Sequence, residues 1–214
     1  DGDGDFAEDE LVAVSGAEGV ALVDEHGKLF TTSARPPESI RIEESGDEKV
    51  VIRVEGKYSS DDGEQHMRYV TRLTFRAGST RVNIAHTHIN DYLETEFTDI
   101  TSLYIPIDLS QPIRQAEVFT GEQQDGLRAH SADGAALRLF QSDENTVTVN
   151  GQIVARRASW TPGLSPGVVR VNDGKRSVTA VIHDFQERWP KGLAAEGNRL
   201  SLELFPEQPD SEYG

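Results

Sequence analysis

Short apolar runs recur along the whole chain, and most of them alternate with polar residues at a period of two. Such alternation is typical of half-buried β-strands, while the Gly, Asp, Asn and Pro residues between the runs are typical of turns. The pattern predicts strands at residues 11–15, 19–25, 28–32, 39–44, 49–58, 66–77, 80–89, 101–109, 115–121, 135–141, 146–157, 168–173, 177–186 and 199–205.

No segment has the period of an amphipathic helix of three turns. The best helical stretch is 190–197, PKGLAAEG, with Pro190 near its first turn and Gly197 as a C-terminal stop. Many strands with short connections and little helix predict an all-β fold, an antiparallel β-sandwich with at most one short helix near the C-terminus. We expect an acidic flexible arm at residues 1–10, one sandwich domain over 11–207 and a tail at 208–214.

One hairpin can be placed in register. Gly78 and Ser79 suit a two-residue turn between the segments 66–77 and 80–89. The residues that then face each other are Leu73 and Ile84, Thr71 and His86, and Tyr69 and His88. Because side chains alternate between the faces of a strand, Tyr69, His86 and His88 share one face, and Arg68, Arg72 and Arg76 share the other, which Arg53 and Lys57 would extend.

The composition excludes some classes of function and site but does not identify one function. The 214 residues carry a net charge of −16 and no cysteine, so disulfides and cysteine-based zinc sites are excluded. Sixteen of the 21 basic residues are arginine, and the acidic coat is compatible with a salt-adapted (halophilic) source. No basic stripe for nucleic acid and no apolar run long enough to span a bilayer is present. Because the chain starts at Asp1, we expect a processed product or a piece of a longer protein.

Two segments resemble a known family. Residues 69–91, YVTRLTFRAGSTRVNIAHTHIND, and residues 185–207, FQERWPKGLAAEGNRLSLELFPE, are similar to the central β domain of exo-rhamnogalacturonan lyase and YetA-like proteins. His86-Thr87 matches the step that ends a strand pair in that family, with His88 where an aromatic residue is commoner. The later matches are Trp189, Pro190, Lys191, Leu193, Leu204, Phe205 and Pro206. The resemblance covers residues 12–207 and implies a sandwich (supersandwich-like) that packs beside further domains, an N-terminal barrel and an α/α toroid, which this chain lacks.

The resemblance implies a polysaccharide-lyase-like module, extracellular or on the cell surface, that binds or helps to cleave an acidic, uronate-containing polysaccharide. β-Elimination from a uronate needs a group that neutralises the carboxylate, a base and an acid. We therefore take His86, His88 and Tyr69 as candidate catalytic residues, and Arg68, Arg72 and Trp160 as candidate substrate-binding residues.

Several alternatives stay open. The histidines can be hydrogen-bonded strand residues, and the arginines can be a solvated sheet face. A metal site on His86 and His88 with Asp91 or Glu94 has no identified third ligand, so no metal residues are assigned, although a divalent cation such as calcium remains an alternative. The second functional class is a non-catalytic structural or adhesion module of a surface, appendage or virion. We expect no strong lyase activity from this chain alone.

Overall fold

The computed structural model describes residues 13–14, 18–93, 98–120, 128–156 and 165–207. These residues form an all-β protein with antiparallel strand pairs, as the alternation predicts, consistent with a β-sandwich. None of the described residues forms a helix, so none forms a helix able to cross a membrane. The expected arm at 1–10, the expected tail at 208–214 and Trp160 lie outside the described residues.

The chain divides into two compact units. We call residues 17–101 the hairpin unit and residues 1–16 with 102–214 the sandwich unit. The prediction of one domain over residues 11–207 stays a prediction. Each unit is described by itself.

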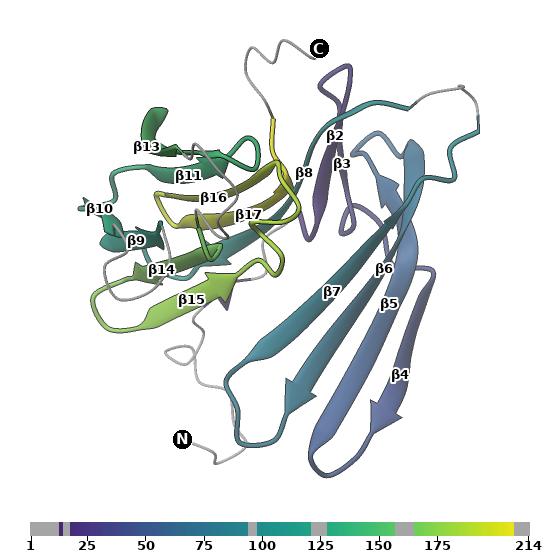
Figure 1. Ribbon diagram of the computed structural model, residues 1–214. Helices are drawn as coiled ribbons and strands as arrows, with labels where there is room; N and C mark the ends of the chain where they lie inside the picture. The colour runs from purple at the N-terminus through teal and green to yellow at the C-terminus, as the bar shows by residue number, and fades with distance from the viewer. Residues whose placement is uncertain (1–12, 15–17, 94–97, 121–127, 157–164, 208–214) are drawn as a thin grey trace. The chain divides into compact units, whose positions relative to one another are not determined.

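The hairpin unit is built on long neighbouring strands, drawn in purple, blue and teal in Figure 1. Its strands are β2 (Ala21–Asp24), β3 (Leu29–Thr31), β4 (Ser39–Ser45), β5 (Lys49–Ser59), β6 (Gln65–Arg76) and β7 (Val82–Ile89). They pair antiparallel in the order β2-β3-β5-β6-β7, and β4 pairs with β5. Buried apolar side chains gather at the β2–β3 end: Leu22, Phe30, Tyr58, Met67 and Tyr69.

The predicted register of β6 against β7 is confirmed. Thr71 faces His86 and Tyr69 faces His88 without any register shift between the two strands. The turn differs from the expected one, because Ser79 N donates to Arg76 O at 3.2 Å and Gly78 has a φ of +68°. The turn is therefore centred on Ala77 and Gly78 rather than on Gly78 and Ser79, and glycine supplies the left-handed backbone that it requires.

The sandwich unit has two sheets that enclose one apolar core. The first runs β13 (Gln152–Arg156), β12 (Thr146–Val149), β11 (Leu137–Gln141), β16 (Lys191–Glu196), β17 (Arg199–Phe205) and β8 (Ile100–Leu109), which β1 (Ala13–Val14) joins. The second runs β10 (Arg128–Ala132), β9 (Gln115–Phe119), β14 (Val168–Asn172) and β15 (Ser177–Val181). The core joins inward residues of both sheets, such as Leu139, Leu193 and Leu200 from the first and Val118 and Val169 from the second.

The expected helix at 190–197 is wrong. Residues 191–196 form β16, which is paired on both sides by β11 and β17 and drawn between them in Figure 1. Leu193 and Ala195 alternate into the core, and Gly197, with a φ of +61°, begins the tight turn to β17. Strand pairing on both edges satisfies the backbone and buries apolar surface, which outweighs a weak helix propensity.

Two other strand predictions need correction. Segment 146–157 is not one strand, because Asn150 and Gly151 both have positive φ and close a hairpin between β12 and β13. Strand β10 was not predicted, and β15 ends at Val181 although the pattern extended it to 186.

Candidate functional site

The predicted residues lie on the two faces of the β5–β6–β7 sheet. Pairing puts Tyr69, Thr71, His86 and His88 on one face and Arg68 and Arg72 on the other. Tyr58 joins the first group from β5. We call Tyr58, Tyr69, Thr71, His86 and His88 the His–Tyr cluster.

His86 is the hydrogen-bonded centre of the His–Tyr cluster. Tyr58 Oη lies 2.5 Å from His86 Nε2, and Thr71 Oγ1 lies 2.8 Å from His86 Nδ1. Burial raises the pKa of Tyr58 far above its ordinary value, so the phenol stays protonated and forms a hydrogen bond with Nε2 as a neutral group. Burial, with His88 nearby, lowers the pKa of His86 to about 4, so the imidazole is neutral, and one of its two ring nitrogens donates a hydrogen bond while the other accepts one.

The aromatic rings of the cluster pack closely on one another. The Tyr69 and His86 rings are stacked with centroids 6.1 Å apart, and Tyr58 lies 5.8 Å from the His88 ring. Tyr58 and Tyr69 are 0% and 2% exposed, and Tyr69 Oη donates to Thr32 O at 3.3 Å. The two phenols therefore have no access to a polymer in this conformation.

His88 differs from His86 in its partners. It is half-buried, burial lowers its pKa, and its Nδ1 is buried without a hydrogen-bond partner among the described residues. His66, on β6, has a buried Nε2 without a described partner, and its ring lies 4.6 Å from that of Tyr92. Unlike His86, which has a hydrogen-bond partner at each ring nitrogen, His88 therefore keeps a ring nitrogen that no described neighbour binds.

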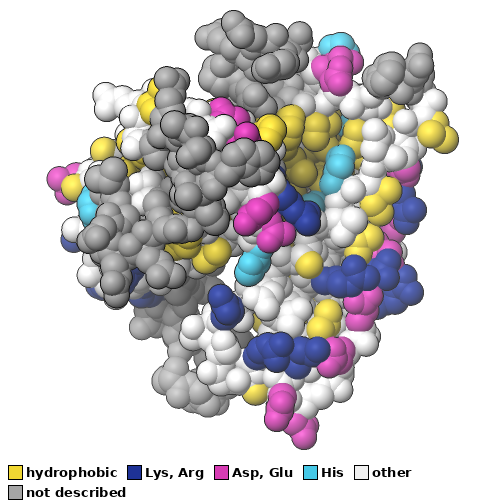
Figure 2. Space-filling model, in the orientation of Figure 1, with side chains coloured by type: hydrophobic (Ala, Val, Ile, Leu, Met, Phe, Trp, Pro, Cys, Tyr) yellow, Lys and Arg dark blue, Asp and Glu magenta, His cyan; other side chains and the backbone are white. Residues whose placement is uncertain are grey.

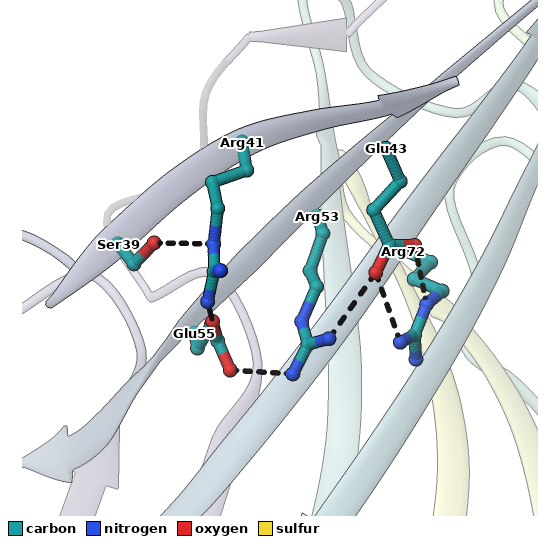
Figure 3. A network of polar contacts seen from close by, with 6 residues as sticks. All are labelled: Ser39, Arg41, Glu43, Arg53, Glu55 and Arg72. Atoms are coloured by element: carbon teal, nitrogen blue, oxygen red, sulfur yellow. Dashed lines mark hydrogen bonds and ion pairs between the residues drawn. The ribbon is translucent and has the colours of Figure 1, made fainter.

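The opposite face carries an alternating ladder of charges, which we call the arginine face: Arg41, Glu43, Arg53, Glu55, Lys57, Arg68 and Arg72. Figure 3 shows the order Arg41–Glu55–Arg53–Glu43–Arg72, with Ser39 holding Arg41 at one end. Arg53 Nη2 lies 2.6 Å from Glu55, and Arg72 Nε lies 2.7 Å from Glu43. In Figure 2 dark-blue and magenta side chains alternate along the right-hand edge, over β4 and β5.

The carboxylates of the arginine face are held ionised by these contacts. Hydrogen bonds from Arg41 and then Arg53 lower the pKa of Glu55, and a hydrogen bond from Arg72 lowers that of Glu43. Because Glu55 is only 8% exposed, its carboxylate has little contact with water in the folded protein, and hydrogen bonds from Arg41 and Arg53 take the place of hydrogen bonds to water. Glu43 lies in the bulge of β4 between Ile42 and Glu44, and from there it contacts Arg53 and Arg72.

The sheet separates the candidate residues that the elimination hypothesis would bring together. Arg68 and Arg72 point away from the His–Tyr cluster, and no bulge on β6 or β7 rotates either of them to the cluster's side. Sequence analysis did not identify Tyr58 or the two glutamates. The alternation within 49–58 could have identified Tyr58, since it shares a face with Val54 and Gly56.

No group of three or more His, Asp or Glu side chains that could hold a metal occurs among the described residues. Asp91 is described, but Glu94, the other expected ligand, is not.

Comparison with known families supports the resemblance. Residues 30–120 match the family model of the PcRGLX-like protein central beta sandwich domain, a domain of rhamnogalacturonan lyase-like proteins. The match includes the whole His–Tyr cluster and the whole arginine face. No curated protein matches the chain.

Proposed function

We propose that this chain is a glycan-binding module of a rhamnogalacturonan lyase-like protein, outside the cell or on its surface, and that it binds an acidic, uronate-containing polysaccharide. The family match over residues 30–120 supports the glycan connection. The choice of an acidic ligand and the place where it binds are argued from the charges of the arginine face.

One observation carries the proposal. Lys57 on β5 directly faces Arg68 on β6, both are half-buried, and neither has an acidic partner among the described residues. One step along the same face, Arg53 and Arg72 also face each other, but Glu43 and Glu55 neutralise them. Like charges directly opposite each other destabilise a sheet. A carboxylate bound between Lys57 and Arg68 relieves this repulsion, and a guanidinium can bind it through two hydrogen bonds.

Binding is favoured over cleavage by this chain alone. β-Elimination needs the carboxylate-neutralising cation and the base around the same sugar. Here Arg68 and the His–Tyr cluster lie on opposite faces of one sheet, and His86 has both nitrogens engaged. We therefore expect the purified chain to produce no strong ultraviolet absorbance of unsaturated uronate from pectin.

The test is a titration of the chain with polygalacturonate at low and high salt. We expect saturable binding that Lys57→Gln and Arg68→Gln each weaken about tenfold, or about 1.4 kcal/mol. Arg76→Gln is the matched control, because it removes the same charge from the same face about 27 Å further along β6. An equal loss in all three variants would mean unspecific charge attraction, and that result would overturn the proposed site.

The exposed apolar face favours a second candidate function, assembly or adhesion. On the side of the sheet that bears the His–Tyr cluster, Ile40 and Ile42 are each 66% exposed, and Phe75, Val82 and Ile84 are 38–45% exposed. Patches of this kind mark interaction surfaces. Absence of binding to every polysaccharide, with self-association that Ile42→Ser abolishes in sedimentation, would favour this function.

A further inference from the structure

A groove of about 470 Å³ lies on the sandwich unit. It runs over β8 and β17 on the face of the first sheet that points away from the core, since Leu200 and Leu202 point inward and Ser201 and Glu203 alternate with them. Ser201 and Ser102 contribute short hydroxyl side chains to the lining, and Tyr104 and Phe205 contribute rings. From Arg199 to Phe205 the strand extends about 20 Å, which is long enough for several sugar units.

The charges of the groove are already balanced. Arg138 holds Glu203 through Nε at 3.1 Å and Nη2 at 3.0 Å, and Arg199 holds Asp108 through Nε at 2.7 Å and Nη2 at 3.1 Å. The charged lining residues are two arginines, Arg138 and Arg199, and two glutamates, Glu203 and Glu207, so their formal charges sum to zero. An anionic ligand would meet carboxylates here and gain no free cation.

The backbone beneath Glu203 is adapted to this arrangement. A Cβ on Gly192, which faces Glu203 across β16 and β17, would lie 1.8 Å from Glu203 Oε2. The carboxylate therefore rests directly over the glycine, and a Cβ at this position would displace it.

We propose that this groove is a binding site for a neutral, hydroxyl-rich sugar segment. A sugar hydroxyl both donates and accepts hydrogen bonds, so paired guanidinium and carboxylate groups satisfy it from either side. Aromatic rings suit the apolar C–H faces of a pyranose ring, and the volume lies within the range of small-molecule sites. The proposal does not rest on the acidic-glycan site of the hairpin unit, which differs from it in location and in charge.

The experiment titrates the whole chain with a panel of neutral polysaccharides (galactan, arabinan, xyloglucan and mannan) and, in parallel, with polygalacturonate. We expect at least one neutral polymer to bind. Tyr104→Ala should weaken that binding about tenfold, and Ser201→Phe, which fills the groove from its lining, should abolish it. Unchanged thermal unfolding of both variants confirms that they fold.

Lys57→Gln is the matched control, because it alters the proposed acidic site alone. We expect it to leave neutral-polymer binding within twofold of the original value, while Tyr104→Ala leaves polygalacturonate binding unchanged. Failure of every neutral polymer to bind, or neutral binding that persists in Ser201→Phe, would overturn the groove proposal whatever polygalacturonate does.

Discussion

Tyr58 Oη and His86 Nε2 lie 2.5 Å apart, and the tyrosine that makes this hydrogen bond is fully shielded from solvent. The two residues come from strands that do not pair with each other, β5 and β7, so the bond crosses over β6 between them. It ties three strands together at the end of the sheet where the hairpin unit is most buried. The same bond occupies the imidazole nitrogen that a general base would use.

Replacement of Tyr58 by phenylalanine should therefore reduce stability. The variant leaves His86 Nε2 without its hydrogen-bond partner in a desolvated place, which costs roughly 1–2 kcal/mol. Urea denaturation measures the loss. Tyr69→Phe is the matched control, because it removes a longer bond, 3.3 Å, from an equally buried ring, and it should cost less. A Tyr58→Phe variant no less stable than Tyr69→Phe would contradict this role.

Stability should fall as the pH is lowered from about 6.5 to 4. The pKa of His86 is about 4 in the folded protein against 6.5 ordinarily, so the unfolded chain binds more protons throughout that window. The stability that neutral His86 contributes is complete above pH 6.5 and is lost by pH 4, a change of roughly 2–3 kcal/mol. Denaturation at several pH values should show this slope, and His86→Gln should flatten it. An unchanged slope in the variant would assign the effect to His88 and His66, whose pKa values burial also lowers.

Glu55 should contribute far more to stability than an exposed glutamate on the same strand ladder. Glu55→Gln removes the charge that Arg41 and Arg53 share in a place only 8% exposed, and we expect a clear loss of stability. Glu44→Gln is the control, since its side chain is 52% exposed in its pair with Lys49 and should cost less than about 0.5 kcal/mol. Chemical denaturation of the two variants compares them directly, and equal losses would show that the ladder is no more than a solvated surface.

Gly167→Ala should be among the most damaging single substitutions in the sandwich unit. Its φ is +66°, and an added Cβ would lie 2.4 Å from the Cβ of Phe185, which is buried. Gly151→Ala shares the backbone strain, with a φ of +77°, but its Cβ would meet nothing within 4 Å. We expect about 1 kcal/mol for Gly151→Ala and roughly 2–4 kcal/mol for Gly167→Ala. Thermal unfolding of both separates the steric cost from the conformational one, and similar melting temperatures would refute the steric contribution.

The sequence alone was enough for most of the strands and for one register. Alternation in 66–77 and 80–89, with a glycine turn between them, determined that Thr71 faces His86 and Tyr69 faces His88. A slip of one residue would have moved every apolar side chain to the wrong face, which is why local pattern decides register here. The same alternation places the arginines on the face opposite the histidines.

The tertiary structure alone decided the contacts between residues that are distant in the sequence and the places where strands are irregular. Residues 191–196 are flanked by residues typical of helix ends, yet they form strand β16, because β11 and β17 pair with them on both sides. The contact of Tyr58 with His86 crosses β6 beside the register shift between Lys57 and Ser59, and Glu43, in the bulge of β4, contacts Arg72 on β6, a strand that β4 does not pair with. Local alternation determines the side of the sheet to which each side chain points, so the faces were predictable from the sequence. The burial and pairing of the whole sheet determine which strands are neighbours and where bulges occur, so the contacts across three strands were not predictable.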